Sequence, residues 1–192
     1  MKILISGNPN YGLAKSVKTI YPDATFVSRS NGGWNLQERN KREELAILSL
    51  DYDVFVSISC LWHFYQTELV QEVALEWEKN KHKGYIIAIG STADTPVKAT
   101  TWEYPANKKA LRAYCRQLSQ MSASPNVNTF RVTYLSPGNL HTPLQDKKLP
   151  GVEKLDCNYV AGLIKWLIEQ PPNVNISELC LDYTEVNNLG IT

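Results

Sequence analysis

The chain has 192 residues, enough for one domain of ordinary size that buries a core without disulfides or a structural metal. Hydrophobic residues make up 43% of the composition and charged residues 20%, a balance typical of globular proteins and not of disordered or fibrous ones. Twenty basic and nineteen acidic residues leave a formal charge of +1. The composition therefore gives no electrostatic reason to expect a nucleic acid or an anionic membrane as partner.

The apolar run at Met1-Lys2-Ile3 and the residues after it is too short for a signal peptide. No later run approaches the roughly 18 residues that a membrane span needs. These features predict a soluble, cytoplasmic protein. The three histidines are scattered, so no metal site is expected. The cysteines are also scattered and are predicted to be reduced thiols in the core: Cys60, Cys115, Cys157 and Cys180.

Six strand-like runs follow one another along the chain, and most are continuously apolar, as in strands buried on both faces of a parallel sheet. They are Lys2–Ser6, Ala24–Ser28, Asp53–Ser59, Gly84–Ser91, Asn128–Ser136 and Ser177–Tyr183. Helix-period segments lie between them: Tyr65–Lys81, Pro105–Met121 and a stripe from Val160 to Ile168. This alternation predicts an α/β fold, a doubly wound parallel sheet of the Rossmann type in a single three-layer domain over 1–192. Its ligands would lie beyond the carboxyl ends of the strands.

The first strand runs into a glycine-containing turn before a segment that can form a helix. A glycine at the strand end allows a tight turn, and a second at the helix start lets backbone N–H groups approach a pyrophosphate. The third expected glycine is Ala14, so a plain βα turn without a ligand is an equal alternative. The candidate cofactor contacts in this turn are Gly7, Asn8, Asn10, Tyr11, Gly12 and Leu13.

The second strand ends in Ser28-Arg29-Ser30, where an NAD-specific fold usually carries an acid for the ribose diol. Arg29, with Ser30 beside it, is able to pair with a 2′-phosphate through its planar fork of donors. This position favours NADP over NAD as the cofactor. The alternative is a solvated surface arginine.

The predicted chemistry lies at Ser91, Tyr104 and Lys108. Ser91 ends the fourth strand-like run, and thirteen residues later Tyr104 and Lys108 stand four apart, on one face of a helix. A phenol near pKa 10 is a poor acid–base catalyst at neutral pH, but a neighbouring ammonium stabilises the phenolate. A serine hydroxyl opposite can hold the carbonyl or hydroxyl oxygen of a substrate.

With this arrangement the sequence resembles the short-chain dehydrogenase/reductase family, in which a serine closes a central strand and Tyr-x-x-x-Lys begins the next helix. The segment from Leu135 to Pro143 is similar to the family's Pro-Gly loop. The resemblance implies that Tyr104 is the acid–base group, that Lys108 binds the nicotinamide ribose and lowers the pKa of Tyr104, and that Ser91 orients the substrate. It also implies cofactor contacts at the adenine (Asn35, Leu36) and around the nicotinamide (Pro137, Gly138, Leu140, Thr142), with Ser57 as a further cofactor-binding residue.

The chain departs from the family pattern in three places. Ser57-Ile58-Ser59-Cys60 stands where the family has Asn-Asn-Ala-Gly, with Ser57 as a partial substitute. The family's relay asparagine has no counterpart; His63 is the nearest polar candidate, or else part of an aromatic cluster at a helix start. Between Ser28 and Asn35 a helix and a strand of the family are nearly absent, so we expect the sheet to lack an edge strand.

Two functions are compatible with these features. The first is an NADP-dependent oxidoreductase that transfers a hydride between nicotinamide and a small carbonyl or alcohol, with Tyr104 as acid or base. The second is a non-catalytic, dinucleotide-binding sensor or partner-binding module on the same fold. Within the long loop Asn139–Asp156, the polar segment Leu144–Leu155 predicts an open substrate site. Analogy with the family points to a homodimer or homotetramer.

Overall fold

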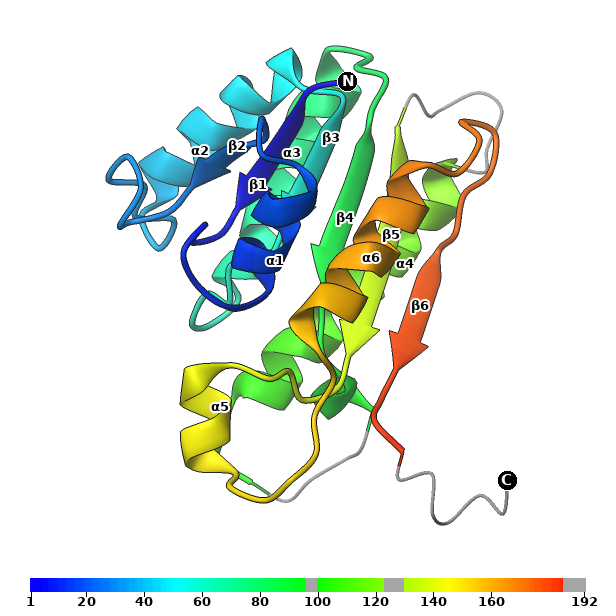
Figure 1. The fold of residues 1–192 in the computed structure, drawn as a ribbon. Coiled ribbons are helices and arrows are strands. Elements are labelled where there is room, and N and C mark those ends of the chain that lie inside the picture. Colours follow the sequence, from blue (N-terminus) through cyan, green and yellow to red (C-terminus); the bar gives the residue numbers. More distant parts are fainter. Residues whose placement is uncertain (96–99, 123–129, 185–192) are drawn as a thin grey trace.

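The computed structural model describes residues 1–95, 100–122 and 130–184. Six parallel strands form one sheet in the order β2-β1-β3-β4-β5-β6 (Figure 1). The strands are β1 (Ile3–Ser6), β2 (Thr25–Val27), β3 (Val54–Ser57), β4 (Tyr85–Ile89), β5 (Arg131–Pro137) and β6 (Glu178–Leu181). Because the chain leaves β1 in one direction to form β2 and then returns to the other side of β1 for β3, the sheet is doubly wound, as predicted.

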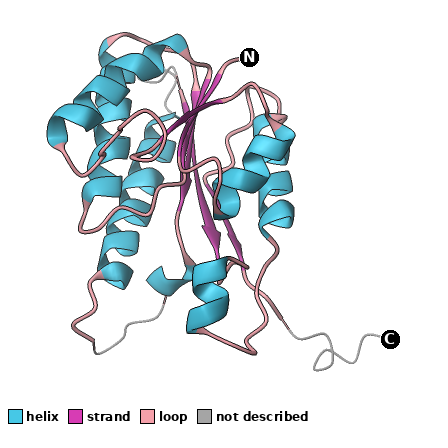
Figure 2. Cartoon of the chain, turned by 60° about the vertical axis from the view of Figure 1, so that its left-hand side comes forward, coloured by secondary structure: helices cyan, strands magenta, loops and turns pink. Residues whose placement is uncertain are grey.

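Helices cover both faces of this sheet, which makes three layers (Figure 2). One face is covered by α1 (Gly12–Ile20) and α6 (Cys157–Ile168), and the other by α2 (Arg39–Leu48), α3 (Tyr65–Lys79) and α4 (Tyr104–Ser122). The short helix α5 (Pro143–Lys148) and the 3₁₀ turn Thr92–Asp94 lie past the carboxyl ends of the strands, and a second 3₁₀ turn spans Ser49–Asp51. The predicted α/β class is confirmed.

The continuous apolar runs arise because neighbouring residues of a strand serve different cores. Phe55 of β3 packs into the core under α2, α3 and α4, whereas Val56 packs into the core under α1 and α6. Ile86 and Ile87 of β4 divide in the same way. Strands that are buried on both sides have no polar face, so their residues are continuously apolar. This is why the strands could be recognised as apolar runs in the sequence.

Two helices were not predicted. The first half of α2, from Arg39 to Glu44, contains no apolar residue, so it has no stripe to recognise. Its anchor is Arg42, a buried side chain that donates to the carbonyls of Leu36 and Gln37 at 3.2 and 3.1 Å. The other missed helix, α5, lies inside the segment predicted as a loop and has no buried residue.

Several strands are shorter than their predicted bounds. The fourth ends at Ile89, so Ser91 lies two residues beyond the strand and not within it. The first residues of the predicted fifth strand, Asn128 and its neighbour, lie outside the described residues. On the outer side of β2 the sheet has no further strand of the described residues, as expected, because the chain after β2 adds no edge strand there. Instead it makes a loop that is held by a hydrogen bond from Asn31 Nδ2 to the carbonyl of Phe26 at 2.6 Å.

Candidate active site

Ser91, Tyr104 and Lys108 are brought together at the carboxyl edge of the sheet. Ser91 follows β4, and its Oγ accepts the N–H of Ala93 at 3.2 Å at the start of the 3₁₀ turn. Tyr104 begins α4, and its phenol lies close enough to the Ser91 side chain for the serine to lower its pKa. Lys108 lies one turn later, with its Nζ 5.6 Å from the centroid of the Tyr104 ring. The sequence spacing of the three residues therefore does bring their side chains close together.

The protonation of this pair differs from the expectation. Burial raises the pKa of Tyr104 to about 12, against a smaller lowering by the hydrogen bond with Ser91. Burial also lowers the pKa of Lys108. A net lowering of the Tyr104 pKa, as the resemblance implies, is therefore not seen in this arrangement. Its physical reason is that both groups are desolvated and the ammonium is held by acceptors other than the phenol.

Those acceptors come from a residue that the sequence did not reveal, Gln66, in the first turn of α3. Lys108 Nζ donates to Gln66 Oε1 at 2.7 Å and to the carbonyl of Ile89 at 3.1 Å. Gln66 Nε2 in turn donates to the carbonyl of Ile89 at 3.1 Å and to the carbonyl and Oγ of Ser57 at 3.2 and 3.3 Å. Because Nε2 faces these acceptors, the amide is oriented with its oxygen toward the ammonium. Gln66 links the ends of β3 and β4 to the helix that carries Lys108.

His63, the sequence candidate for a relay group, lies elsewhere. It is exposed, its Nδ1 is 3.1 Å from Glu103 Oε2, and its ring meets Tyr65 edge-on at 5.5 Å. These contacts agree with the alternative of an aromatic cluster at the start of α3. The signal that could have revealed Gln66 is a neutral polar residue at an inward position of a helix that directly follows a strand end.

The glycine turn after β1 is shaped by close packing. A Cβ on Gly7 would lie 2.9 Å from the Cβ of Ala14, so Gly7 lets α1 pack tightly against the end of β1. Asn8 Oδ1 accepts the N–H of Asn10 at 3.0 Å within the turn, and Leu13 is buried in the core. Gly12, at φ +52, opens α1 in the left-handed region. The start of α1 has no acid in its first turn, and no side chain of the described residues caps its first N–H groups.

The segment after β5 lies against this turn. A Cβ on Gly12 would be 3.2 Å from Cγ2 of Thr142, and the hydroxyl of Tyr11 accepts the N–H of Leu144 at 3.1 Å. The turn predicted to hold the pyrophosphate and the loop predicted to lie at the nicotinamide are therefore adjacent. Thr142 Oγ1 also caps α5 by accepting the N–H of Gln145 at 3.2 Å.

Close packing also determines the path of the chain from Pro137 to Leu140. Pro137 is the last residue of β5, and the N–H of Gly138 donates to the carbonyl of Leu181 at 2.9 Å. A Cβ on Gly138 would lie 1.9 Å from Asp182 Oδ1, so a larger residue here would require the exposed Asp182 side chain to move. Leu140 pairs with Leu155 in an isolated parallel bridge, which closes the long loop.

On the far side of the turn, the residues predicted to bind the adenosine lie around the loop after β2. Arg29 is exposed and makes no hydrogen bond or ion pair with any described residue. Ser30 Oγ is 3.2 Å from Ser28 Oγ. Asn35 Nδ2 donates to Glu38 at 2.6 Å, while its Oδ1 is buried without a partner in the described part of the chain. Leu36 is buried in the core.

The cysteine prediction was half right. All four are free, and Cys115 and Cys157 are buried, but Cys60 and Cys180 are exposed because they lie in a loop and on the edge strand. Within the described residues, no group of three or more His, Cys, Asp or Glu side chains is placed to hold a metal ion. None of the described helices has both the length and the apolar character to cross a membrane.

No protein-family model and no curated protein matches the chain. Solved structures match along nearly all of it. A short-chain dehydrogenase/reductase family protein is 19% identical, with a TM-score of 0.72 and coverage of 95% of both chains. Serine dehydrogenase complexed with NADP⁺ is 18% identical, with a TM-score of 0.68, over 97% of this chain and 96% of that one. The 3-alpha-hydroxysteroid dehydrogenase from Pseudomonas sp. B-0831, complexed with NADH, is 16% identical, with a TM-score of 0.73, over 95% of both chains. This chain has a short-chain dehydrogenase fold.

The likeness concerns the fold and not the reaction. A similar match, at 14% identity and a TM-score of 0.71 over 94% of this chain and 90% of that one, is described as ribose-5-phosphate isomerase from Brucella melitensis 16M. Chemistry on the short-chain dehydrogenase fold has to be argued from its site. Here the side chains of Ser91, Tyr104 and Lys108 come together. The start of α4 and the N-terminus of α1 lie at the same end of the sheet (Figure 1).

Proposed function

We propose that this chain is an NADP-dependent oxidoreductase that transfers a hydride between nicotinamide and a small carbonyl or alcohol. The observation that carries the proposal is the contact of Ser91 with Tyr104, with Lys108 one turn further along α4, at the ligand-binding edge of a doubly wound sheet. A nicotinamide dinucleotide, when bound, supplies or accepts the hydride. The protein supplies the proton and the orientation.

Each of the three residues has a distinct task. Tyr104 donates its proton to the carbonyl oxygen during reduction and takes it back during oxidation, while Ser91 Oγ holds the same oxygen. Lys108 gives two of its three N–H groups to Gln66 and Ile89, which leaves the third for a ribose hydroxyl. The positive charge beside the phenol ring favours the phenolate when the proton leaves.

Three further groups suit a dinucleotide. The unpaired N–H groups at the start of α1 suit a pyrophosphate. Asn35 Oδ1, buried without a partner among the described residues, is an acceptor suited to an adenine amino group. Arg29, exposed and without a partner in the described chain, suits a 2′-phosphate, which is the basis for choosing NADP over NAD.

The test is consumption of NADPH with a panel of small carbonyl compounds, followed by absorbance, for the wild-type chain and Tyr104→Phe. Loss of the proton donor should reduce kcat by roughly 100-fold or more, because general acid catalysis contributes about that much. Calorimetric titration with NADPH should give the same affinity for both proteins. Turnover that persists in Tyr104→Phe would sink the assignment.

A binding module without catalysis is the second candidate. The observation in its favour is that burial raises the pKa of Tyr104 to about 12, which disfavours the phenolate at neutral pH. This function predicts NADPH binding by calorimetry with no turnover on any member of the panel. Size-exclusion chromatography would also test the proposed homodimer or homotetramer.

A further inference from the structure

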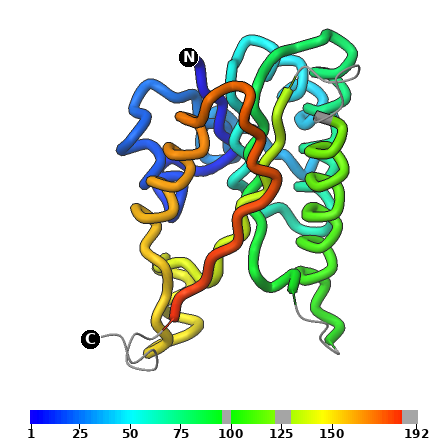
Figure 3. The backbone as a smooth tube through the Cα atoms, turned by 90° about the vertical axis from the view of Figure 1, so that its right-hand side faces the viewer, coloured from blue at the N-terminus to red at the C-terminus, as the bar shows by residue number. Residues whose placement is uncertain are grey.

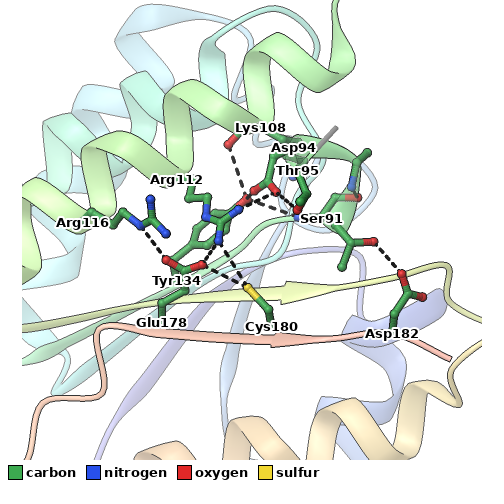
Figure 4. A network of polar contacts seen from close by, with 12 residues as sticks. Ser91, Asp94, Thr95, Lys108, Arg112, Arg116, Tyr134, Glu178, Cys180 and Asp182 are labelled. Atoms are coloured by element: carbon green, nitrogen blue, oxygen red, sulfur yellow. Dashed lines mark hydrogen bonds and ion pairs between the residues drawn. The ribbon is translucent and has the colours of Figure 1, made fainter. Parts of the chain in front are cut away.

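Tyr134 of β5 lies directly beneath the backbone that carries Ser91. Its side chain is fully buried, and a Cβ on Gly90 would lie 2.0 Å from its hydroxyl oxygen. The hydroxyl accepts the N–H of Ser91 at 3.3 Å and donates to Asp94 Oδ2 at 2.6 Å (Figure 4). One phenol therefore holds both ends of the short segment from Ser91 to Asp94.

Asp94 connects this segment to the catalytic helix. Its side chain is fully buried, and Oδ1 accepts from Arg112 at 3.1 Å and from Thr95 Oγ1 at 3.1 Å. Arg112 stands on α4 one turn after Lys108 and two turns after Tyr104, and it also forms an ion pair with Glu178 of β6 (Figure 4). The carboxylate thus fixes the distance between the Ser91 backbone and the helix of Tyr104.

We propose that Tyr134 and Asp94 are positioning residues that hold Ser91 toward Tyr104, through the hydrogen bonds from Ser91 N to the Tyr134 hydroxyl and from that hydroxyl to Asp94. The inference rests on the proposed role of Ser91. The inference goes beyond that role because it names the groups that hold Ser91, which lies outside any strand, in a fixed position.

The charges around the pair support this arrangement. Burial raises the pKa of Tyr134, so its hydroxyl keeps the proton that it donates to Asp94. The ionised groups that face Asp94 are Arg112, in direct contact, and Lys108 on the same helix. The ion pair with Arg112 makes Asp94 a strong acceptor for the hydroxyl of Tyr134.

The chain provides a matched control in Tyr85 of β4. Tyr85 is also buried, and its hydroxyl is bonded to Thr133, but this contact lies at the opposite end of the sheet from Ser91. Tyr134→Phe and Tyr85→Phe each remove one buried hydroxyl and keep the ring. A general loss of core polarity would affect both variants alike, whereas positioning of Ser91 concerns Tyr134 only.

The experiment is a double-mutant cycle of Tyr134→Phe and Ser91→Ala, with NADPH and the carbonyl that the wild-type chain reduces fastest. We expect Tyr134→Phe to lower kcat roughly 10- to 100-fold, as small misplacements of a reacting group do, with no change in KM for NADPH. In the Ser91→Ala background the same change should cost nothing further. Tyr85→Phe should retain wild-type kcat. Equal losses in both backgrounds, or an unchanged kcat in Tyr134→Phe, would overturn the proposal.

A second measurement needs no turnover. Amide hydrogen exchange, resolved by NMR, should accelerate at Ser91 in Tyr134→Phe and in Asp94→Asn, while the amides of β4 stay protected. An unchanged rate at Ser91 in both variants overturns the proposal even if the chain reduces no substrate. Faster exchange without any turnover would instead contradict the proposed oxidoreductase function, while supporting the hydrogen bonds by which Tyr134 and Asp94 hold Ser91.

Discussion

The side-chain amide of Gln66 is neutral, and its oxygen accepts a hydrogen bond from the buried ammonium of Lys108. A neutral acceptor satisfies this donor without cancelling its charge. Lys108 therefore remains available as a positive charge beside Tyr104. Burial already lowers the pKa of Lys108, so the hydrogen bond from Nζ to Gln66 opposes a loss of charge that desolvation favours.

Replacing Gln66 by methionine, which has a similar shape and no strong acceptor, should lower the pKa of Lys108 further. The ammonium is then lost at a lower pH, so the deficit in kcat/KM should widen as pH rises, reaching about tenfold, the effect of 1.4 kcal/mol. A pH profile of kcat/KM measures this. Gln71→Met, on an exposed position of the same helix, is the control. A deficit that is constant across pH would contradict the role given to Gln66.

Arg29 gives a second prediction about a single residue. Because its guanidinium is exposed and bonded to no described residue, Arg29→Ala should leave the melting temperature unchanged. It should raise KM for NADPH roughly 10- to 100-fold, the value of a charge-assisted hydrogen bond, and leave KM for NADH as it was. Arg39→Ala, which removes an exposed arginine paired with Glu43, should change neither constant. Equal effects on NADPH and NADH would argue against a 2′-phosphate contact.

Among single residues, the sequence could predict contacts between residues of the same helix. Tyr104 and Lys108 are four residues apart on one helix, so their proximity follows from helical geometry alone. Gln66 and Lys108 are 42 residues apart, and Tyr134 and Asp94 are 40 apart. Such contacts depend on how α3, α4 and β5 pack around the sheet, and no pattern within a single element encodes them.

The glycine turn shows how elements are placed. Gly7→Ala should push α1 away from the end of β1, because the new Cβ would lie 2.9 Å from that of Ala14. We expect a loss of about 1–3 kcal/mol in the free energy of unfolding, as for other overpacked sites, and weaker NADPH binding. Denaturant unfolding and calorimetry measure the two effects.

Gly162→Ala is the matched control for Gly7→Ala. Gly162 lies within α6, and a Cβ there meets nothing within 4 Å. Alanine should stabilise the helix by roughly 0.5–1 kcal/mol. If both substitutions changed stability in the same direction, the steric account of Gly7 would be wrong.

The elements that were recognised and those that were missed differ in what holds them. Strands and the helices α3, α4 and α6 pack through apolar stripes, which have a period that can be read. The first half of α2 is held instead by Arg42, which forms ion pairs with Glu68 and Glu72 and bonds to loop carbonyls, and only the second half packs apolar residues into the core. A helix with a buried cation has no hydrophobic period in that part of its sequence.

Across the whole molecule, the sheet ends in β6, which runs between α4 and α6 (Figure 3). β6 is tied to α4 by Glu178, which pairs with Arg112 and with Arg116, the latter at 2.6 Å. Burial raises the pKa of Glu178, but the hydrogen bonds from Arg112, Cys180 and Arg116 outweigh it and hold the pKa near 2. The edge strand is thus pinned by ion pairs, in addition to its pairing with β5 and the packing of Leu179 and Leu181.

This pinning predicts how stability depends on pH. The folded pKa of Glu178 lies below its ordinary value of 4.5, so its contribution is present above pH 4.5 and is lost as the pH falls toward 2. Glu178→Gln should be less stable by about 1 kcal/mol at neutral pH, the upper range for partly exposed pairs, and should lose less than the wild type below pH 4.5. Thermal unfolding at several pH values measures both. Parallel stability curves for the two proteins would contradict this role.

The fold of the whole chain was the most predictable level, since the order of apolar runs and helical stripes leaves few ways to cover a parallel sheet. What could not be predicted is how its edges are finished. The ion pairs of β6 join residues 66 and 62 apart, and the last part of the loop after β2 is held by the buried side chain of Arg42.

Gln66 also has a consequence for the order of events in folding. Its amide touches the ends of β3 and β4 and the ammonium on α4, so its hydrogen bonds can form only after all three segments have docked. Secondary structure and collapse can form before these segments dock, but Lys108 cannot be positioned to bind a ribose until they have docked. During refolding from denaturant, NADPH binding should therefore return with the slowest phase of tertiary assembly and have no burst amplitude.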